Sequence, residues 1–305
     1  MKRILTAIIL IPLVLLAVFK APLWLFALLI ALVAVLAIHE YLNIVKGYGV
    51  EPVGWALYAM AVAVIAGVYI SGDPDLLASF PWGLWLFKCW TILLLLPLVF
   101  GIPVVFRGEM RMALPGAAAS AFGVLYVAVP LALLVALRRD VLQNVLVVFI
   151  LFSVWAGDTA AYYVGRSLGH HKLAPAVSPN KTWEGAIASV LASVAVAALV
   201  TRFHAGIGGL FSGPEAGYGF SLHSPVSVPW GPVIVLGILT NAAAQFGDLF
   251  ESALKRGAQV KDSGSLLPGH GGMLDRIDAL FFAIPVVWYY ANLTGFPASA
   301  ILHRP

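Results

Sequence analysis

Charge and cysteine are both scarce in this sequence. Only 10% of the 305 residues are charged, 61% are hydrophobic, and Cys89 is the single cysteine. A lone cysteine excludes an intrachain disulfide, and the low charge excludes an ordinary soluble domain, in which about 25% of residues are charged. The formal net charge of +4 indicates at most a weak affinity for anionic lipid or an anionic substrate. We therefore expect a membrane-embedded chain with no nucleic-acid partner.

Apolar runs of membrane-spanning length recur throughout the sequence. A transmembrane helix needs about 20 mostly apolar residues to cross the hydrocarbon core of a bilayer. Nine stretches fit this description: 4–19, 22–38, 53–70, 84–105, 116–137, 141–163, 185–203, 230–250 and 277–295. They are continuous rather than alternating, which favours helices over barrel strands. The sequence thus predicts an all-α, polytopic integral membrane protein with about nine transmembrane helices.

The basic residues predict how the chain lies in the inner (plasma) membrane. Lys2 and Arg3 precede the first apolar run and no convincing cleavage site follows it, so we expect a retained helix rather than a signal peptide. With the N-terminus in the cytoplasm, about two thirds of the lysines and arginines fall on the cytoplasmic side. We expect about five helices in 1–140 for membrane embedding and oligomer contacts. About four helices in 141–305 should carry a catalytic site that faces the cytoplasm.

A first polar cluster follows one face of the span that reads "TNAAAQFGDLFESALKRG". Five polar residues recur there at steps of four and three, which is helical spacing: Asn241, Gln245, Asp248, Ser252 and Lys255. An aspartate at the centre of a span costs about 2.5–3.5 kcal/mol on insertion scales. Such a stripe is explained either by hydrogen bonds that join two helices or by one wall of a polar cavity. We favour the cavity, because the stripe ends in a carboxylate and a lysine.

A second cluster is the stretch "KDSGSLLPGHGGMLDRID", residues 261–278. Asp275 and Asp278 stand three apart at the start of the last span and share a helix face, where acidic residues are also at ease without any ligand. Together with Asp248 they would supply three carboxylates, and Mg²⁺ prefers oxygen ligands that it shares with substrate phosphates. His270 suits a structural role and a catalytic role equally well. Four basic residues suit a bound phosphate: Lys255, Arg256, Lys261 and Arg276.

A third cluster begins in the span 141–163. Within "DTAAYYVGRSLG", the residues Asp158, Tyr162 and Arg166 stand four apart and so share a helix face. His170 and His171 follow directly and are expected in a solvated loop rather than as metal ligands.

The loop continues as "SPNKTWEG", residues 178–185. Ser178 followed by Pro179 is typical of a helix N-cap with proline in the first turn. Lys181 and Thr182 would then stand at a helix start, where free backbone amides bind phosphate.

At these residues the sequence resembles the phosphatidate cytidylyltransferases, also called CDP-diacylglycerol synthases. The family signature, S-x-x-K-R-x₄-K-D-x-G-x₂-L-P-x-H-G-G-x₂-D-R-x-D, is matched at every specified position by "SALKRGAQVKDSGSLLPGHGGMLDRID", residues 252–278. "SPNKTWEG" and "DTAAYYVGRSLG" resemble secondary motifs of the same family. The resemblance is strong over about 150–290 and rests elsewhere on hydrophobic character alone.

The resemblance implies that CTP and phosphatidate react to give CDP-diacylglycerol and pyrophosphate in phospholipid biosynthesis. It implies Mg²⁺, alone or with a second cation, and a homodimer that forms through membrane helices. The metal would be held by Asp248, Asp275 and Asp278. The catalytic residues would be Asp248, Ser252, Lys255, Arg256, Lys261, His270 and Arg276. The substrate-binding residues would be Asp158, Arg166, Ser178, Asn180, Lys181, Thr182, Glu184, Asp262, Gly271 and Gly272.

Three other classes of protein are weighed against this interpretation. The CDP-alcohol phosphatidyltransferases carry D-G-x₂-A-R-x₈-G-x₃-D-x₃-D, which is absent from the sequence. A CTP-dependent lipid kinase would use similar substrates but would release CDP instead of pyrophosphate. A cation-coupled transporter would carry broken helices at matching positions in two halves, whereas the polar residues here gather in the second half.

Overall fold

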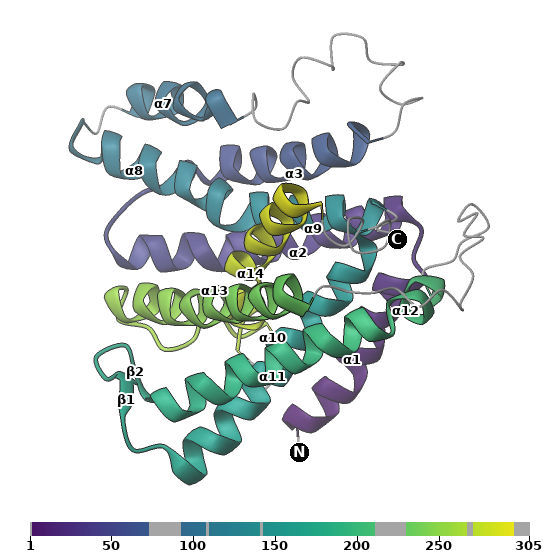
Figure 1. Cartoon of the computed structure of the whole chain (residues 1–305). Helices are drawn as coiled ribbons and strands as arrows, with labels where there is room; N and C mark the ends of the chain where they lie inside the picture. Colours follow the sequence, from purple (N-terminus) through teal and green to yellow (C-terminus); the bar gives the residue numbers. More distant parts are fainter. Residues whose placement is uncertain are drawn as a thin grey trace. The chain divides into compact units, whose positions relative to one another are not determined.

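The computed structural model describes residues 2–72, 93–107, 110–140, 143–210, 230–266 and 271–295, and nearly all of them are helical (Figure 1). The helices of the first half are α1 (Lys2–Phe19), α2 (Leu23–Gly47), α3 (Gly54–Ile70), α7 (Leu96–Arg107), α8 (Met110–Gly123), the π-helix η1 (Val124–Ala128) and α9 (Val129–Arg139). Those of the second half are α10 (Asn144–Leu168), α11 (Trp183–Arg202), α12 (His204–Leu210), α13 (Trp230–Gly257) and α14 (Leu274–Thr294). A short hairpin of β1 (Lys172–Ala174) and β2 (Ser178–Thr182) precedes α11.

Six helical segments among the described residues are long and apolar enough to cross a membrane. They are Leu23–Gly47, Met110–Arg139, Asn144–Leu168, Trp183–Arg202, Trp230–Gly257 and Leu274–Thr294. Three of the nine predicted spans correspond to shorter apolar helices: Leu10–Phe19, Gly54–Ile70 and Leu96–Phe106. The first part of the predicted span 84–105, including Cys89, lies outside the described residues. The helical, multi-pass class is therefore confirmed, whereas the number nine stays a prediction.

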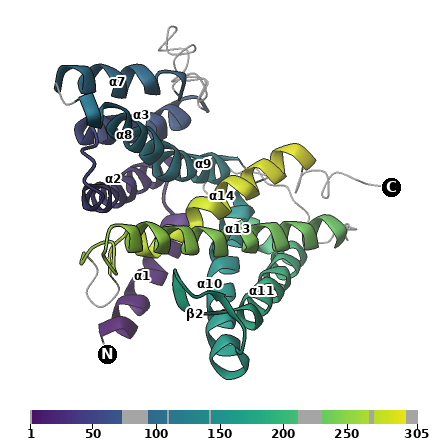
Figure 2. The same ribbon diagram turned by 90° about the vertical axis from the view of Figure 1, so that its left-hand side faces the viewer.

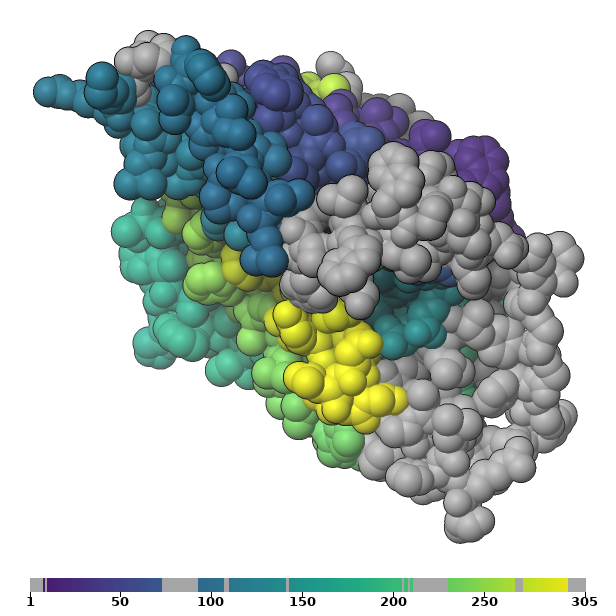
Figure 3. All heavy atoms as spheres, turned by 90° about the horizontal axis from the view of Figure 1, so that it is seen from above, coloured from purple at the N-terminus to yellow at the C-terminus, as the bar shows by residue number. Residues whose placement is uncertain are grey.

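Large apolar side chains lie exposed along these helices. Trp55 and Leu191 are 67% and 65% exposed, and Leu98 on α7 is 56% exposed. In water such a surface would be unfavourable, but lipid tails are as apolar as the side chains themselves. Figure 3 shows α7 and α8, which pack together, as one continuous part of the surface.

The chain divides into two compact units, each of which is made of three separate stretches of the sequence. The first compact unit comprises Met1–Ile9, Leu23–Ala136 and Leu254–Ile277. In it α2 packs on α3, and both contact η1. The hydroxyl of Ser120, which is fully buried, accepts the backbone N–H of Val53 at 2.8 Å and so fixes the start of α3 against α8. This unit thus combines helices of the first half with the segment from the end of α13 to the start of α14.

The second compact unit comprises Leu10–Pro22, Leu137–Ala253 and Asp278–Pro305. Its main contact is α10 lying along α11, with the hairpin at one end of the pair (Figure 2). α13 approaches α14 closely at Gly247, where an added Cβ would lie 2.7 Å from the carbonyl oxygen of Asp278 and 3.1 Å from Phe282. Only a residue without a side chain permits this contact, because real Cβ atoms essentially never come so close.

The start of α11 corrects one prediction from the sequence. Ser178 is not a helix N-cap: residues 178–182 form β2, which pairs antiparallel with β1 through Lys172 opposite Thr182 and Ala174 opposite Ser178. The N-cap is Thr182, whose hydroxyl accepts the N–H of Gly185 at 3.2 Å. The strand pairing holds residues 178–182 extended, so the helix begins four residues later than the serine-proline pair indicated.

Candidate active site

The signature segment 252–278 folds as the end of α13, a connection and the start of α14. α13 ends where Gln259 adopts a positive φ of 60°, with the N–H of Val260 bonded to the carbonyl of Lys255 and that of Gln259 to Arg256. This pair of bonds is the Schellman arrangement, which satisfies the last carbonyls of a helix and turns the chain back. The predicted residue His270 lies in 267–270, outside the described residues.

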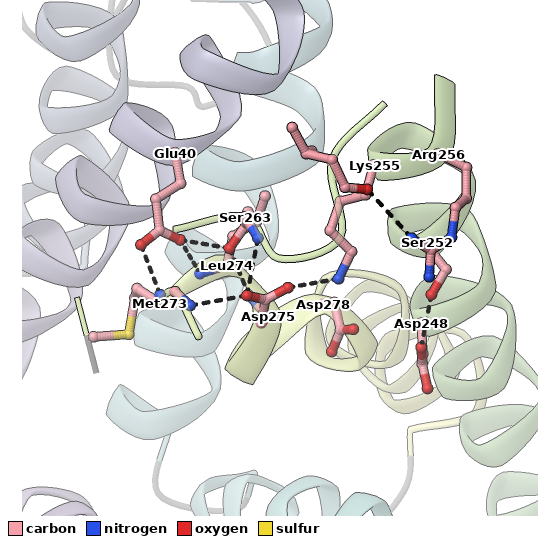
Figure 4. Close-up of polar contacts among 12 residues, drawn as sticks. Glu40, Asp248, Ser252, Lys255, Arg256, Ser263, Met273, Leu274, Asp275 and Asp278 are labelled. Atoms are coloured by element: carbon pink, nitrogen blue, oxygen red, sulfur yellow. Dashed lines mark hydrogen bonds and ion pairs between the residues drawn. The ribbon is translucent and has the colours of Figure 1, made fainter. Parts of the chain in front are cut away.

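Lys255 and Asp275 form a nearly buried ion pair in the first compact unit. The Nζ of Lys255 lies 2.5 Å from Oδ1 of Asp275, and their side chains are 11% and 7% exposed. The other oxygen of Asp275 accepts the backbone N–H groups of Gly272 at 2.8 Å and Ser263 at 3.0 Å. Both carboxylate oxygens are thus engaged by the protein itself, which ties the end of α13 and the connection to the first turn of α14 (Figure 4).

A residue that the sequence did not predict lies beside this pair. Glu40 of α2 is 4% exposed, and its carboxylate accepts the N–H of Met273 at 2.9 Å, the N–H of Leu274 at 2.8 Å and the hydroxyl of Ser263 at 2.8 Å (Figure 4). An ionisable residue inside an apolar helix is costly unless it is paired, so Glu40 did carry a signal. The sequence did not indicate which groups bind Glu40, because Glu40 and Met273 are 233 residues apart.

The remaining positive residues of the signature are exposed. Arg256 stands in the last turn of α13, Lys261 in the connection and Arg276 in the first turn of α14. Asp262 is exposed as well, and Gly271 has a φ of 78°, a conformation that suits glycine. Exposed cations near a glycine-rich connection are suited to binding a phosphate from solution.

The second compact unit holds a different set of polar contacts. The Nζ of Lys181, at the end of β2, lies 2.6 Å from Oδ2 of Asp248 on α13, and the two side chains are 26% and 35% exposed. The hydroxyl of Ser252 lies 3.4 Å from Oδ1 of the same aspartate. In this unit a partly exposed cation is therefore held in place by a partly exposed carboxylate.

The polar residues of the stripe on α13 make two kinds of contact. Asn241 donates to the hydroxyl of Ser189 at 2.9 Å, and Gln245 donates to the carbonyl of Ala186 at 3.1 Å, so its first part joins α13 to α11. Its later members, Asp248 and Lys255, form ion pairs instead. Hydrogen bonding between two helices is thus confirmed for the first part of the stripe, whereas the polar cavity stays a prediction.

The third cluster is organised mainly around the hairpin. Glu184 accepts from Nδ1 of His171 at 2.7 Å and from its backbone N–H at 3.2 Å, which ties the hairpin to the first turn of α11. His171 is exposed, as predicted. Asn180 is exposed on β2. Glu184 and Thr182 thus shape the segment that presents Lys181.

On α10 the predicted shared face is confirmed in part. Arg166 donates to the hydroxyl of Tyr162 at 2.9 Å, one turn apart. Asp158 is exposed one turn earlier.

The three predicted metal ligands differ in how they are engaged. Among the residues that the structure describes, no three His, Cys, Asp or Glu side chains form a group able to hold a metal ion. Asp275 is taken up by Lys255 and two N–H groups. Asp248 and Asp278 belong to one unit and flank the close contact of α13 with α14 at Gly247. Asp248 is paired with Lys181, and Oδ1 of Asp278 accepts the N–H of Ala279. In proteins Mg²⁺ is commonly held by one or two carboxylates together with substrate phosphates rather than by a cage of protein ligands.

Comparison with known proteins places the chain in a family. Phosphatidate cytidylyltransferase from Brucella suis biovar 1 (strain 1330) is 43% identical over 151 residues, which cover 50% of this chain and 48% of the relative. The proteins of the same name from Haemophilus influenzae and Bacillus subtilis are 39% and 36% identical over 145 and 140 residues, and each match covers 45% of the relative. The chain thus spans about half the length of the curated relatives it matches. The sequence profile of the cytidylyltransferase family matches residues 1–294, nearly all of the chain, and so the chain belongs to this family.

Proposed function

We propose that this protein is a phosphatidate cytidylyltransferase that converts CTP and phosphatidate to CDP-diacylglycerol and pyrophosphate. The observation that carries the proposal is the folded signature segment, which combines an internally neutralised pair, Lys255 and Asp275, with three exposed cations: Arg256, Lys261 and Arg276. Family membership and the names of the relatives support the same reaction. The long apolar helices support a substrate that resides in a bilayer.

In the proposed reaction a phosphate oxygen of phosphatidate attacks the α-phosphorus of CTP. A new P–O–P bond forms, the bond between the α-phosphorus and the β-phosphate oxygen breaks, and pyrophosphate leaves with that electron pair. A phosphate monoester is nucleophilic at neutral pH, so no residue is needed as a general base. The protein has to position the reactants and neutralise their charge. We assign this to Lys181 in the second unit and to Arg256, Lys261 and Arg276 in the first.

A divalent cation is part of the proposal. Asp248 and Asp278 would hold it, with the hydroxyl of Ser252 near the first of them. When bound, Mg²⁺ would supply positive charge that offsets the negative charge of the phosphates and of the leaving pyrophosphate. Asp275 contributes differently from what the sequence indicated: we assign it to holding Lys255 and the connection in place.

The setting of the enzyme is also proposed. The N-terminus and the active site would face the cytoplasm, where CTP is available, in the inner membrane of the cell. Two copies would associate through membrane helices. Both points rest on the charge distribution and the family resemblance, and they are tested by labelling engineered cysteines from either side of the membrane and by crosslinking in the bilayer.

The experiment that tests the reaction uses purified protein, phosphatidate, Mg²⁺ and CTP labelled in either the α- or the γ-phosphate. The proposal requires the α-label in lipid and the γ-label in pyrophosphate. A γ-label in lipid would instead show a CTP-dependent kinase. No transfer of either label by a folded protein, combined with cation flux into vesicles, would show a transporter. A reaction with a chelator in place of Mg²⁺ serves as the inactive control.

A further inference from the structure

Glu40 on α2 makes contacts that neither the signature nor the proposed reaction accounts for. Its carboxylate accepts three hydrogen bonds from the signature segment, at 2.8 to 2.9 Å, and is almost completely buried. We propose that Glu40 is a positioning residue of the active site, which sets the first turn of α14 and, through it, Asp275 and Lys255. The expected fall in kcat rests on the proposed function. The expected effect on the backbone of the first turn of α14 does not.

The first step of the argument concerns the start of α14. The first N–H groups of a helix have no partner within the helix and need an acceptor from elsewhere. In α14 the N–H of Leu274 and that of Met273 just before it both point to the carboxylate of Glu40. A negative charge is also favoured at this end of a helix dipole. Glu40 therefore does for α14 what an N-cap side chain does for other helices, but from a distant segment of the chain.

The second step concerns the connection. Ser263 donates its hydroxyl to Glu40 and accepts the N–H of Asp275 at 3.3 Å, while its own N–H is donated to Asp275 at 3.0 Å. Asp275 in turn holds Lys255. One continuous series of contacts therefore leads from Glu40 through Ser263 and Asp275 to Lys255, and all four residues belong to the first compact unit (Figure 4).

The third step concerns space. An added Cβ at Gly264 would lie 2.6 Å from Oε1 of Glu40, and one at Gly272 would overlap with the carboxylate as well. Two glycines of the signature are thus in direct contact with this single side chain. The connection is packed around a carboxylate, which explains these glycines by close approach rather than by contact with substrate.

A purely structural role and a positioning role predict different results. Glu40→Gln keeps the size of the side chain but replaces one acceptor oxygen with an NH₂ group, which is a donor. At least one of the donors that now bond Glu40 therefore loses its acceptor. Ser263→Ala removes the link between Glu40 and Asp275. Ser120→Ala is the matched structural control, because Ser120 is buried in the same unit and its hydroxyl bonds Val53 and Gly116.

The experiment combines steady-state kinetics with hydrogen exchange of the full-length protein in detergent. We expect Glu40→Gln and Ser263→Ala each to lower kcat by about tenfold or more, with less than about a threefold change in the KM for CTP. Amide exchange in 271–276 should quicken in both variants, while peptides from α3 stay unchanged. The double variant should lose no more activity than the stronger single variant, because both act through one series of contacts.

Ser120→Ala should lower thermal stability and leave kcat unchanged. The proposal is overturned if Glu40→Gln exchanges at the wild-type rate in 271–276, or if Ser120→Ala lowers kcat as much as Glu40→Gln does. Should Glu40→Gln fail to fold, Ser263→Ala carries the same test, and a wild-type kcat in that variant overturns the proposal. An inactive wild-type protein would contradict the proposed reaction, while the exchange data would still decide whether Glu40 positions the segment.

Discussion

The Nζ of Lys255 lies 2.5 Å from Oδ1 of Asp275, and the two residues stand near opposite ends of the signature segment. Their side chains are only 11% and 7% exposed. Two backbone N–H groups complete the environment of the carboxylate. Removing one partner of such a pair leaves an uncompensated charge in a poorly solvated place, which is far more costly than loss of an exposed pair. The buried ion pair of the first compact unit and the accessible pair of Lys181 with Asp248 in the second should therefore respond differently to mutation.

The buried pair predicts a loss of stability. Lys255→Met should lower the free energy of unfolding by about 3–5 kcal/mol, because Asp275 is left buried without its cation. Lys46→Met, at the exposed end of α2, is the control and should change stability by no more than about 0.5 kcal/mol. Denaturant titration in detergent measures both. Equal stability of the two variants would show that the pair contributes nothing.

The accessible pair predicts a loss of activity instead. Lys181→Gln should change the free energy of unfolding by less than about 1 kcal/mol, since both members of its ion pair are partly solvated. If Lys181 binds a phosphate in the transition state, kcat/KM should fall by about a hundredfold. Lys172→Gln, on the paired strand of the same hairpin, should keep wild-type kinetics. A Lys181→Gln enzyme with normal kcat/KM would remove Lys181 from the site.

Metal dependence gives a third prediction. A chelator should abolish activity, and added Mg²⁺ should restore it. Asp248→Asn and Asp278→Asn should each raise the Mg²⁺ concentration for half-maximal activity by about tenfold or more, because each removes one charged ligand. Asp140→Asn, at the exposed end of α9, should leave the titration unchanged. If both variants titrated like the wild type, the ion would be held elsewhere.

The contact of α13 with α14 gives a fourth prediction. Gly247→Ala places a Cβ against the backbone of Asp278, so overpacking should cost about 1–3 kcal/mol and should also reduce activity through displacement of Asp278. Gly231→Ala lies on the same helix, where no atom of the described residues comes within 4 Å of the new Cβ, and it should be tolerated. Thermal unfolding and kcat are measured for both. A fully active Gly247→Ala enzyme would mean that the two helices need not approach so closely.

Much of the fold follows from hydrophobicity alone, because a bilayer accepts few structures other than helices. The apolar stretches that overlap α10, α11, α13 and α14 were each predicted from length and composition. The hairpin was not, since "SPNKTWEG" matches a serine N-cap as well as it matches a strand that ends in a threonine N-cap. Strand pairing with β1 decided between the two, and such pairing has no local signal.

The site was predictable where its residues are close in sequence. Spacing on a helix placed Asp248 beside Ser252, and the signature gathered Lys255 with Asp275. Spacing does not reveal which charge neutralises which, so the pairing of Lys181 with Asp248 and of Lys255 with Asp275 appeared only in three dimensions. The role of Glu40 could not be predicted for the same reason, because the backbone N–H groups that it accepts are 233 and 234 residues away in the sequence.

The bonds between Glu40 and the first turn of α14 also predict how fragments of this protein should behave. A fragment that begins at α10 would contain every motif of the signature, yet its α14 would start with the N–H groups of Met273 and Leu274 lacking their acceptor. Such a fragment should therefore be inactive by itself and regain function when α2 is supplied on a separate polypeptide. If the proposed activity holds, it therefore depends on a helix of the apolar first half, although every motif of the signature lies in the second half.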